Sequence, residues 1–396
     1  MKLALNTYSK YLRPPSIRQF SNRMKGIDDC INLTVGQPDF PMPDVVKQAY
    51  ITAIEQDQTA YSHNKGLLET REAISQYFES RYGFTYDPEE EIIVTNGASE
   101  ALDTALRSIL NEGDEVLIPS PTYAGYIPLI EMLGATPVFI DTSETNYKIT
   151  SQAIEHHITT RTKAILLNYP SNPTGVVLSY QDVASIAHTL QQHETFILSD
   201  EIYAENTFSK PHVSFAQFPE IRDQLLLISG LSKSHAATGI RIGFLLGPSY
   251  LIEKLTFAHA YNCICANVPA QYATIAALKE GITAPQSMNE AYIERKNYLI
   301  EKLQALGFQL DAQPEGAFYI FPNISYYTDN DFDFCVDVLE QAHVAMVPGS
   351  SFTDLGKGHI RISYAYDLES IKEGMDRLER YLSTRYPTKF KNRSSD

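Results

Sequence analysis

The 396-residue chain has no tryptophan, only four cysteines and no long uninterrupted apolar segment. The cysteines, Cys30, Cys263, Cys265 and Cys335, form no Cys-x-x-Cys pair, so the sequence predicts neither a redox motif nor a bound metal. Their scarcity is typical of a reducing compartment and favours a cytoplasmic protein. No stretch approaches the roughly 18 apolar residues of a membrane span, and residues 1–16 lack the apolar core of a signal peptide.

Positive charge is also scarce. The chain carries 32 lysines and arginines against 48 acidic residues, a formal net charge of −16. This balance disfavours binding to nucleic acid or to an anionic membrane surface. The hydrophobic content of 43% is that of an ordinary globular protein, and the length favours more than one domain.

What the chain does have is an alternation of aliphatic runs with segments of helical apolar spacing. Strands are predicted at residues 91–96, 115–119, 136–140, 163–168, 195–200 and 225–229, and a further strand at 239–248 is expected at an edge. The intervals are long enough for crossover helices. The pattern therefore predicts an α/β fold with a mostly parallel seven-stranded sheet covered by helices on both faces.

The C-terminal third changes character. Long helices are predicted at 250–279 and 287–306, and short strands in FQLD, GAFYIFP, VAMVP and HIRISYAY alternate with helices near 331–341 and 368–383. We expect a large domain at 44–286 and a small α+β domain formed by 1–43 together with 287–396. The proline-rich N-terminal segment is expected to pack against the small domain, and the polar residues 388–396 are expected to fray.

Residues that could bind a ligand or take part in catalysis lie at the carboxyl ends of four predicted strands. They are Gly97, Ala98 and Ser99 after 91–96, Asn172 after 163–168, Asp200 and Tyr203 at and after the end of 195–200, and Lys233 after 225–229. Taken singly, each has an ordinary reading as a helix cap, a turn or a surface charge. Ligands of open α/β sheets bind at the carboxyl ends of strands, so the coincidence of all four indicates a site.

Pyridoxal 5′-phosphate is the cofactor that uses all of these groups. Its aldehyde joins a lysine amine, and a carboxylate partners its protonated ring nitrogen. A phenol and an amide can hydrogen-bond its ring hydroxyl. Its phosphate is suited to a helix N-terminus and an arginine.

The chain resembles the class I/II aminotransferases, which belong to fold type I of the pyridoxal-phosphate enzymes. The resemblance is carried by GQPDFPMP (36–43), SNPTG (171–175), SDEIY (199–203), SKSHAATGIRIG (232–243) and HIRISYA (359–365), which occur in the family's order. In GLSKSH (230–235), GAFYIFP (316–322) and VPGSSF (347–352) it is similar to the N-acetyl-diaminopimelate aminotransferases of bacterial lysine biosynthesis.

The resemblance implies a role for each matching residue. Lys233 would bind the cofactor covalently and move the substrate's α-proton, Asp200 would pair with the ring nitrogen, Tyr203 and Asn172 would contact the ring hydroxyl, and Tyr123 would stack on the ring. The phosphate would be held by Gly97, Ala98, Ser99, Ser232 and Arg241, with Tyr61 reaching across a homodimer interface. Arg361 would bind the substrate α-carboxylate, with Gly36 and Asn172 nearby.

Two positions depart from the family pattern. Gly230 stands where many relatives carry a phosphate-binding serine, so Ser232, Ser99 and Arg241 are expected to contribute more. Ser99 stands where aspartate-specific relatives can carry a lysine, which disfavours a dedicated aspartate enzyme.

The expected reaction is a ping-pong amino transfer between an L-amino acid, with glutamate as one partner, and a 2-oxo acid. The side-chain pocket is expected from residues 14–20, the partner subunit and residues 347–352. An aromatic or broad-specificity aminotransferase and a carbon–sulfur lyase of the same fold remain open alternatives. A transcription regulator with an aminotransferase-like domain is disfavoured, because GQPDF begins at Gly36 and leaves no room for a DNA-binding domain before it.

Overall fold

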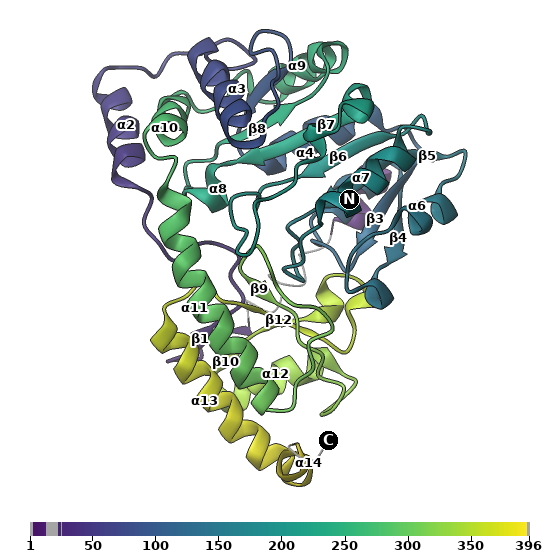
Figure 1. Ribbon diagram of the computed structural model, residues 1–396, viewed down its shortest axis with the longest axis vertical. Coiled ribbons are helices and arrows are strands. Elements are labelled where there is room, and N and C mark those ends of the chain that lie inside the picture. Colours follow the sequence, from purple (N-terminus) through teal and green to yellow (C-terminus); the bar gives the residue numbers. More distant parts are fainter. Residues whose placement is uncertain (1–2, 13–22, 25, 394–396) are drawn as a thin grey trace.

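The computed structural model describes residues 3–12, 23–24 and 26–393, and an elongated molecule in which a large sheet with its helices lies above a smaller group of elements (Figure 1). The loop at 14–20, predicted to line the side-chain pocket, lies outside the described residues.

A seven-stranded sheet forms the centre of the upper part. Its strands are β2 (Ile92–Thr95), β3 (Glu115–Ser120), β4 (Thr136–Asp141), β5 (Thr162–Asn168), β6 (Phe196–Asp200), β7 (Leu225–Gly230) and β8 (Gly243–Leu246). They are ordered β2-β8-β7-β6-β5-β3-β4. Strands β3 to β7 run parallel, whereas β8 is antiparallel to both of its neighbours. The predicted α/β class and mostly parallel sheet are confirmed.

The prediction of an edge strand at 239–248 is wrong. The strand there, β8, is shorter, is fully buried and lies between β2 and β7. A Cβ atom at Gly243 would lie 2.5 Å from the carbonyl carbon of Gly97, so only glycine lets β8 pass this close to the turn after β2. The edges are formed by β2 and β4 instead.

Helices cover both faces of this sheet (Figure 1). In the upper part they are α2 (Asp44–Glu55), α3 (Leu68–Tyr82), α4 (Ala98–Ile109), α5 (Tyr126–Glu131), α6 (Ser151–His157), α7 (Tyr180–Leu190), α8 (Leu231–Ser234), α9 (Ser249–Cys263) and α10 (Val268–Lys279). Neighbouring strand residues point to opposite sides: Leu166 belongs to the core cluster that contains residues of α4 and α9, and Leu167 belongs to the cluster that contains residues of α3, α7 and α10. The sheet is therefore buried on both faces.

The single helix predicted at 250–279 is two helices, α9 and α10. The chain turns sharply between them at Ile264, which has a φ of 67°. The amide of Cys265 donates to the carbonyl of Cys263 over 2.8 Å, which closes the turn.

The lower part contains short strands and long helices. Its elements are β1 (Ile31–Asn32), α11 (Ala284–Ala305), β9 (Tyr319–Ile320), α12 (Asp331–Ala342), β10 (Val344–Ala345), β11 (Val347–Pro348), β12 (Ile360–Ser363), α13 (Leu368–Arg385) and α14 (Pro387–Asn392). The strands form an antiparallel sheet β11-β12-β9 and a parallel pair of β1 with β10. The 3-10 helices η1 (Thr7–Tyr11), η2 (Ser143–Thr145), η3 (Phe215–Gln217), η4 (Pro219–Gln224), η5 (Gly349–Ser351) and η6 (Asp354–Gly356) complete the fold.

Three local predictions in these segments differ from the structure. FQLD is no strand, because Gln309 forms only an isolated bridge with Asn323. Residues 387–392 are helical rather than frayed, since Phe390 packs on the lower core and Arg393 donates to the carbonyl of Ala305. In the N-terminal segment, β1 lies with the lower part as expected, whereas η1 lies against α5 of the upper part.

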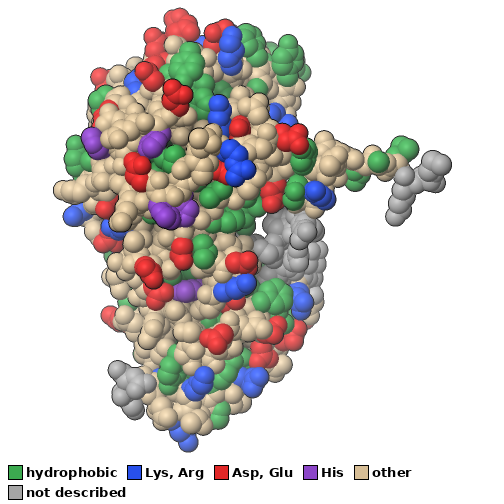
Figure 2. All heavy atoms as spheres, turned by 90° about the vertical axis from the view of Figure 1, so that its right-hand side faces the viewer, with side chains coloured by type: hydrophobic (Ala, Val, Ile, Leu, Met, Phe, Trp, Pro, Cys, Tyr) green, Lys and Arg blue, Asp and Glu red, His purple; other side chains and the backbone are tan. Residues whose placement is uncertain are grey.

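The first described residues extend away from the body as an arm (Figure 2). Leu3 and Leu5 in this arm are 86% and 81% exposed. Among the described residues, no helix has the length and apolarity needed to cross a membrane.

Candidate active site

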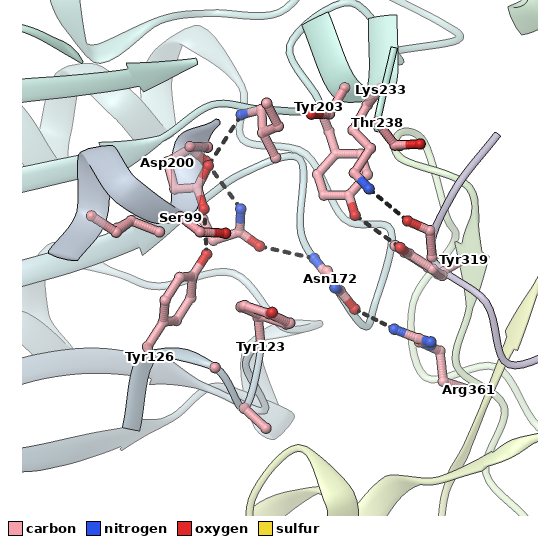
Figure 3. Close-up of a pocket in the computed structure, with 18 of the residues that line it drawn as sticks. Ser99, Tyr123, Tyr126, Asn172, Asp200, Tyr203, Lys233, Thr238, Tyr319 and Arg361 are labelled. Atoms are coloured by element: carbon pink, nitrogen blue, oxygen red, sulfur yellow. Dashed lines mark hydrogen bonds between the residues drawn. The ribbon is translucent and has the colours of Figure 1, made fainter. Parts of the chain in front are cut away.

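A cavity of about 560 Å³ lies at the carboxyl ends of β5, β6 and β7, where the upper and lower parts meet (Figure 3). The sequence-predicted site residues that line it are Gly36, Ala98, Ser99, Tyr123, Asn172, Asp200, Tyr203, Ser232, Lys233, Arg241 and Arg361. These residues span most of the chain, and the parallel strands bring them together because their carboxyl ends share one edge. Gly97 and Tyr61 do not line the cavity.

Lys233 lies in α8, the short helix that follows β7 directly. Its Nζ donates to the carbonyl of Gly36 over 2.5 Å and lies within 6 Å of the ring centroids of Tyr203 and Phe318. Burial, with a further contribution from the positive charge of Arg361, lowers the pKa of Lys233 to about 8. A substantial fraction of this amine is therefore neutral near physiological pH, as a nucleophile or a base requires.

Asp200 ends β6 and is 5% exposed. Its Oδ2 accepts a 2.6 Å hydrogen bond from the hydroxyl of Tyr126, and its Oδ1 accepts one from the backbone of Ile202 over 3.3 Å. Burial raises the pKa of this carboxyl to about 6, and the bond from Tyr126 acts in the opposite direction. The carboxylate is held in a fixed orientation beneath the cavity, where a cationic ring nitrogen would favour its charged form.

Tyr203 and Tyr319 form a pair of buried phenols. Their hydroxyl oxygens lie 2.8 Å apart, and their rings meet edge to face. Tyr319 also lies beneath the guanidinium of Arg361, with 4.3 Å between the ring centroid and Cζ. Burial raises the pKa of Tyr203 well above its usual value, so the phenol stays protonated. Its O–H can therefore donate a hydrogen bond to an acceptor in the cavity.

Arg361 on β12 also lines the cavity, and its hydrogen bonds connect β12 to two distant segments, those of Thr34 and Asn172. Its Nη1 donates to Oδ1 of Asn172 over 2.9 Å, and its Nη2 donates to the carbonyl of Thr34 over 2.5 Å. The side chain is 2% exposed, yet among the described residues its Nε has no hydrogen-bond partner. Within the described part of the chain no carboxylate pairs with this buried guanidinium, so its free N–H is suited to an anionic ligand.

The N-terminus of α4 provides a second anion-binding feature. No side chain of the described residues caps this helix, so the amides of Ala98 and Ser99 have no partner within it. Gly97 has a φ of 89°, and a Cβ there would collide with the guanidinium of Arg241. Gly97 thus allows Arg241 to approach the helix N-terminus, where both favour a phosphate.

Gly230 does not line the cavity. A Cβ at this position would lie 2.8 Å from the carbonyl oxygen of Ile242 and 3.0 Å from Cα of Gly243. The close contact with the chain entering β8 therefore excludes a serine here. Ser232, two residues later, does line the cavity.

Several lining residues were missed by reasoning from the sequence. Tyr126, Asn168, Thr34, Thr238 and Tyr319 all line the cavity. Tyr126 could have been found from its position close to Tyr123 in the sequence, and the two rings meet edge to face with 5.2 Å between their centroids. The others depend on contacts between distant segments, which local patterns do not contain.

Comparison with known proteins agrees with this geometry. The family model for aminotransferase class I and II matches residues 28–378. The chain belongs to the class I and II aminotransferases. It is 44% identical to the probable N-acetyl-LL-diaminopimelate aminotransferase of Bacillus subtilis, over 96% of each chain.

Solved aminotransferases have the same fold. An aromatic aminotransferase from Pyrococcus horikoshii matches with a TM-score of 0.88 and 36% identity, over 92% of this chain and 99% of that one. The Thermus thermophilus aspartate aminotransferase with maleate matches with a TM-score of 0.91 and 31% identity, over 96% and 100%. The protein is therefore an aminotransferase, and enzymes of this class and fold use pyridoxal 5′-phosphate.

The residues of the cavity fit this cofactor. A half-buried lysine of lowered pKa, a buried carboxylate, and an uncapped helix N-terminus beside an arginine match its aldehyde, ring nitrogen and phosphate. As an aminotransferase, the protein acts on amino acids and keto acids.

Proposed function

We propose that this cavity catalyses a ping-pong amino transfer between an L-amino acid and a 2-oxo acid, with glutamate as one partner. The observation that carries the proposal is the convergence of Lys233, Asp200 and Arg361 on one cavity. When bound, pyridoxal 5′-phosphate supplies an aldehyde for the amino group and a cationic ring that accepts electrons from the substrate α-carbon.

Lys233 is the proposed covalent and proton-transferring residue. Burial of the amine and, to a smaller degree, the nearby cation Arg361 favour its neutral form, so it can accept the α-proton of the substrate. Its 2.5 Å hydrogen bond to the carbonyl of Gly36 fixes the position of Nζ when the amine is free. Proton transfer requires such fixed placement near the reacting carbon.

The remaining cofactor contacts divide between ring and phosphate. Asp200 would hold the ring nitrogen protonated, Tyr203 and Asn172 would hydrogen-bond the ring hydroxyl, and Tyr123 would cover the ring face. Gly97, Ala98, Ser99, Ser232 and Arg241 would hold the phosphate. We also assign positioning roles to Tyr126, which orients Asp200, and to Tyr319, which orients Tyr203.

Arg361 would bind the α-carboxylate of the substrate, with Gly36 and Asn172 beside it. Its free Nε–H supports this role, because a carboxylate would satisfy a buried donor that otherwise has no partner among the described residues. This contact would orient the breaking C–H bond relative to the cofactor ring.

For the physiological substrate we propose N-acetyl-LL-2,6-diaminopimelate, in lysine biosynthesis in the cytoplasm. The support is the 44% identity to the probable N-acetyl-LL-diaminopimelate aminotransferase of Bacillus subtilis, which extends over 96% of both chains. The cavity is also large enough for an extended substrate.

A substrate panel tests both levels of the proposal. Purified enzyme receives glutamate and one of three acceptors: the 2-oxo acid of N-acetyl-diaminopimelate, phenylpyruvate or oxaloacetate. We expect kcat/KM for the acylated acceptor to exceed the others by at least about 10-fold, measured by mass spectrometry of the products. Preference for phenylpyruvate would instead favour an aromatic aminotransferase, and pyruvate and ammonia formed from cystathionine without any acceptor would favour a lyase.

We further propose that the protein acts as a homodimer. Tyr61 is 78% exposed, far more than a cofactor ligand of its own chain would be, so it is free to reach a neighbouring site. Tyr261 and Phe257 on α9 are 93% and 54% exposed. These apolar side chains and the leucines of the N-terminal arm support association with a second copy.

The division into domains at 44–286 and at 1–43 with 287–396 also remains our proposal. Its support is that the seven-stranded sheet falls in the first range and the strands β9 to β12 in the second. The core of the lower part is built mostly from the second range. The position of η1 against α5 is an exception, which would connect the N-terminus to the large domain.

A further inference from the structure

Outside the active site, three metal-binding side chains meet between α4 and α9. Glu100 lies in the first turn of α4, and His259 and Cys263 lie one turn apart on α9. Among the described residues, this is the one cluster of three or more His, Cys, Asp or Glu side chains close enough to hold an ion, with ligand atoms within 4.8 Å of one another. The sequence could not reveal it, since Glu100 and Cys263 are 163 positions apart.

The distances within the cluster are short in every direction. Oε1 of Glu100 lies 2.9 Å from Nδ1 of His259 and 2.9 Å from Sγ of Cys263, and that sulfur lies 3.5 Å from the same Nδ1. Ligand atoms on one tetrahedral zinc ion lie about 3.3 to 3.6 Å apart, given zinc bond lengths of about 2.0 to 2.3 Å. Small side-chain shifts would therefore admit an ion.

The burial of His259 and the partial exposure of Cys263 would also suit a bound ion. His259 is completely buried, and among the described residues the one hydrogen-bond partner of its Nε2 is the sulfur of Cys263, at 3.9 Å. Cys263 is partly exposed, which leaves a path for an ion to enter.

We propose that Glu100, His259 and Cys263 form a binding site for one zinc-like divalent ion. A thiolate, an imidazole and a carboxylate together select borderline-soft ions such as Zn²⁺ or Co²⁺ over Mg²⁺ or Ca²⁺. On binding, the thiol proton passes to solvent and the imidazole proton moves from Nδ1 to Nε2, so one proton is released per ion. Water would occupy the fourth position.

The ion would connect two helices beside the proposed phosphate site. Oε2 of Glu100 accepts a 2.5 Å hydrogen bond from the backbone of Asn96, whose carbonyl accepts a 3.4 Å hydrogen bond from Arg241. Because Asn96 precedes the turn at Gly97, an ion on Glu100 would hold this turn against α9. The site is thus a structural clamp next to the cavity, distinct from the groups proposed for catalysis.

Equilibrium dialysis of chelator-treated holoenzyme against ZnCl₂, in buffer without phosphate or thiols, tests the site. We expect about one Zn²⁺ per chain and a rise of a few degrees in the melting temperature. Cys263→Ser keeps a hydrogen-bond donor to Glu100 but loses the thiolate, so it should weaken binding by at least about 10-fold. Cys265→Ser, two residues away, is the matched control and should bind as the wild type does.

Co²⁺ provides a second readout that does not depend on how well a variant folds. A thiolate-to-cobalt charge-transfer band should appear in the wild type and in Cys265→Ser, and be absent from Cys263→Ser. Wild-type protein that binds well below one equivalent of Zn²⁺ at about 100 μM, or Cys263→Ser that binds as tightly as the wild type, would overturn the proposal. The cluster would then be only a hydrogen-bond network between the two helices.

Discussion

Tyr126 shows how a single hydroxyl can set the charge of the proposed cofactor site. Asp200 is buried, which raises its pKa to about 6, and the hydroxyl of Tyr126 favours the charged form by donating to Oδ2 over 2.6 Å. Removing this donor raises the pKa further, so the carboxyl is protonated at a higher pH than in the wild type.

For Tyr126→Phe we expect kcat to fall by about 10-fold, the value of one hydrogen bond to a charged group. The acidic limb of the kcat/KM profile should move to higher pH. The control is Tyr86→Phe, because the buried hydroxyl of Tyr86 has no hydrogen-bond partner among the described residues. An unchanged pH profile in Tyr126→Phe would show that this bond does not control Asp200.

A substitution at Arg361 can distinguish substrate binding from cofactor binding. Arg361→Lys keeps the positive charge but loses the planar fork, which a carboxylate requires for paired hydrogen bonds. We expect KM for amino acids to rise by about 100-fold while the affinity for pyridoxal 5′-phosphate, measured by fluorescence titration, changes little. Weakened cofactor binding with an unchanged KM would mean that Arg361 and Arg241 have been assigned to the wrong ligands.

At the scale of the element, the N-terminus of α4 depends on glycine for its function. A side chain at Gly97 would collide with the guanidinium of Arg241, and the φ of 89° is itself unfavourable for other residues. The proposed phosphate site therefore depends on the backbone as much as on side chains.

We expect Gly97→Ala to weaken binding of the cofactor by at least about 10-fold, because Arg241 is displaced from the helix N-terminus. Gly113→Ala is a matched control: its φ is 90°, but a Cβ there meets nothing within 4 Å. Both variants should lose similar stability in thermal unfolding, and only the first should lose cofactor affinity. Equal cofactor affinity in the two variants would contradict the proposed role of this turn.

At the scale of the whole molecule, the proposed dimer places Tyr61 in the site of the neighbouring chain. Mixed Tyr61→Ala and Lys233→Ala subunits then form heterodimers with one intact site and one doubly changed site. Such a mixture should regain up to about a quarter of wild-type activity after subunit exchange, given random pairing. Activity no greater than the sum of the separate variants would place Tyr61 outside the shared site.

The sequence predicted the large sheet well because most of its strands are buried on both faces and read as continuous aliphatic runs, the partly exposed edge strand β4 being the exception. The sequence-based prediction placed β8 at an edge of the sheet, whereas it lies between β2 and β7. No local pattern in the sequence distinguishes an edge strand from one inserted between two others. Residues at strand ends, such as Asp200 and Lys233, could be proposed from the topology of parallel sheets alone. Tyr319 and the Glu100 cluster could not, because they depend on packing between segments more than 100 positions apart.

The central claim is that Lys233 is the residue that binds the cofactor, and one measurement tests it directly. Holoenzyme is reduced with sodium borohydride, which fixes the cofactor to the amine that holds it, and is then digested and analysed by mass spectrometry. The cofactor mass should appear on the peptide that contains Lys233 and be absent from Lys233→Ala treated in the same way. A cofactor mass on any other lysine of the wild-type protein would contradict the account.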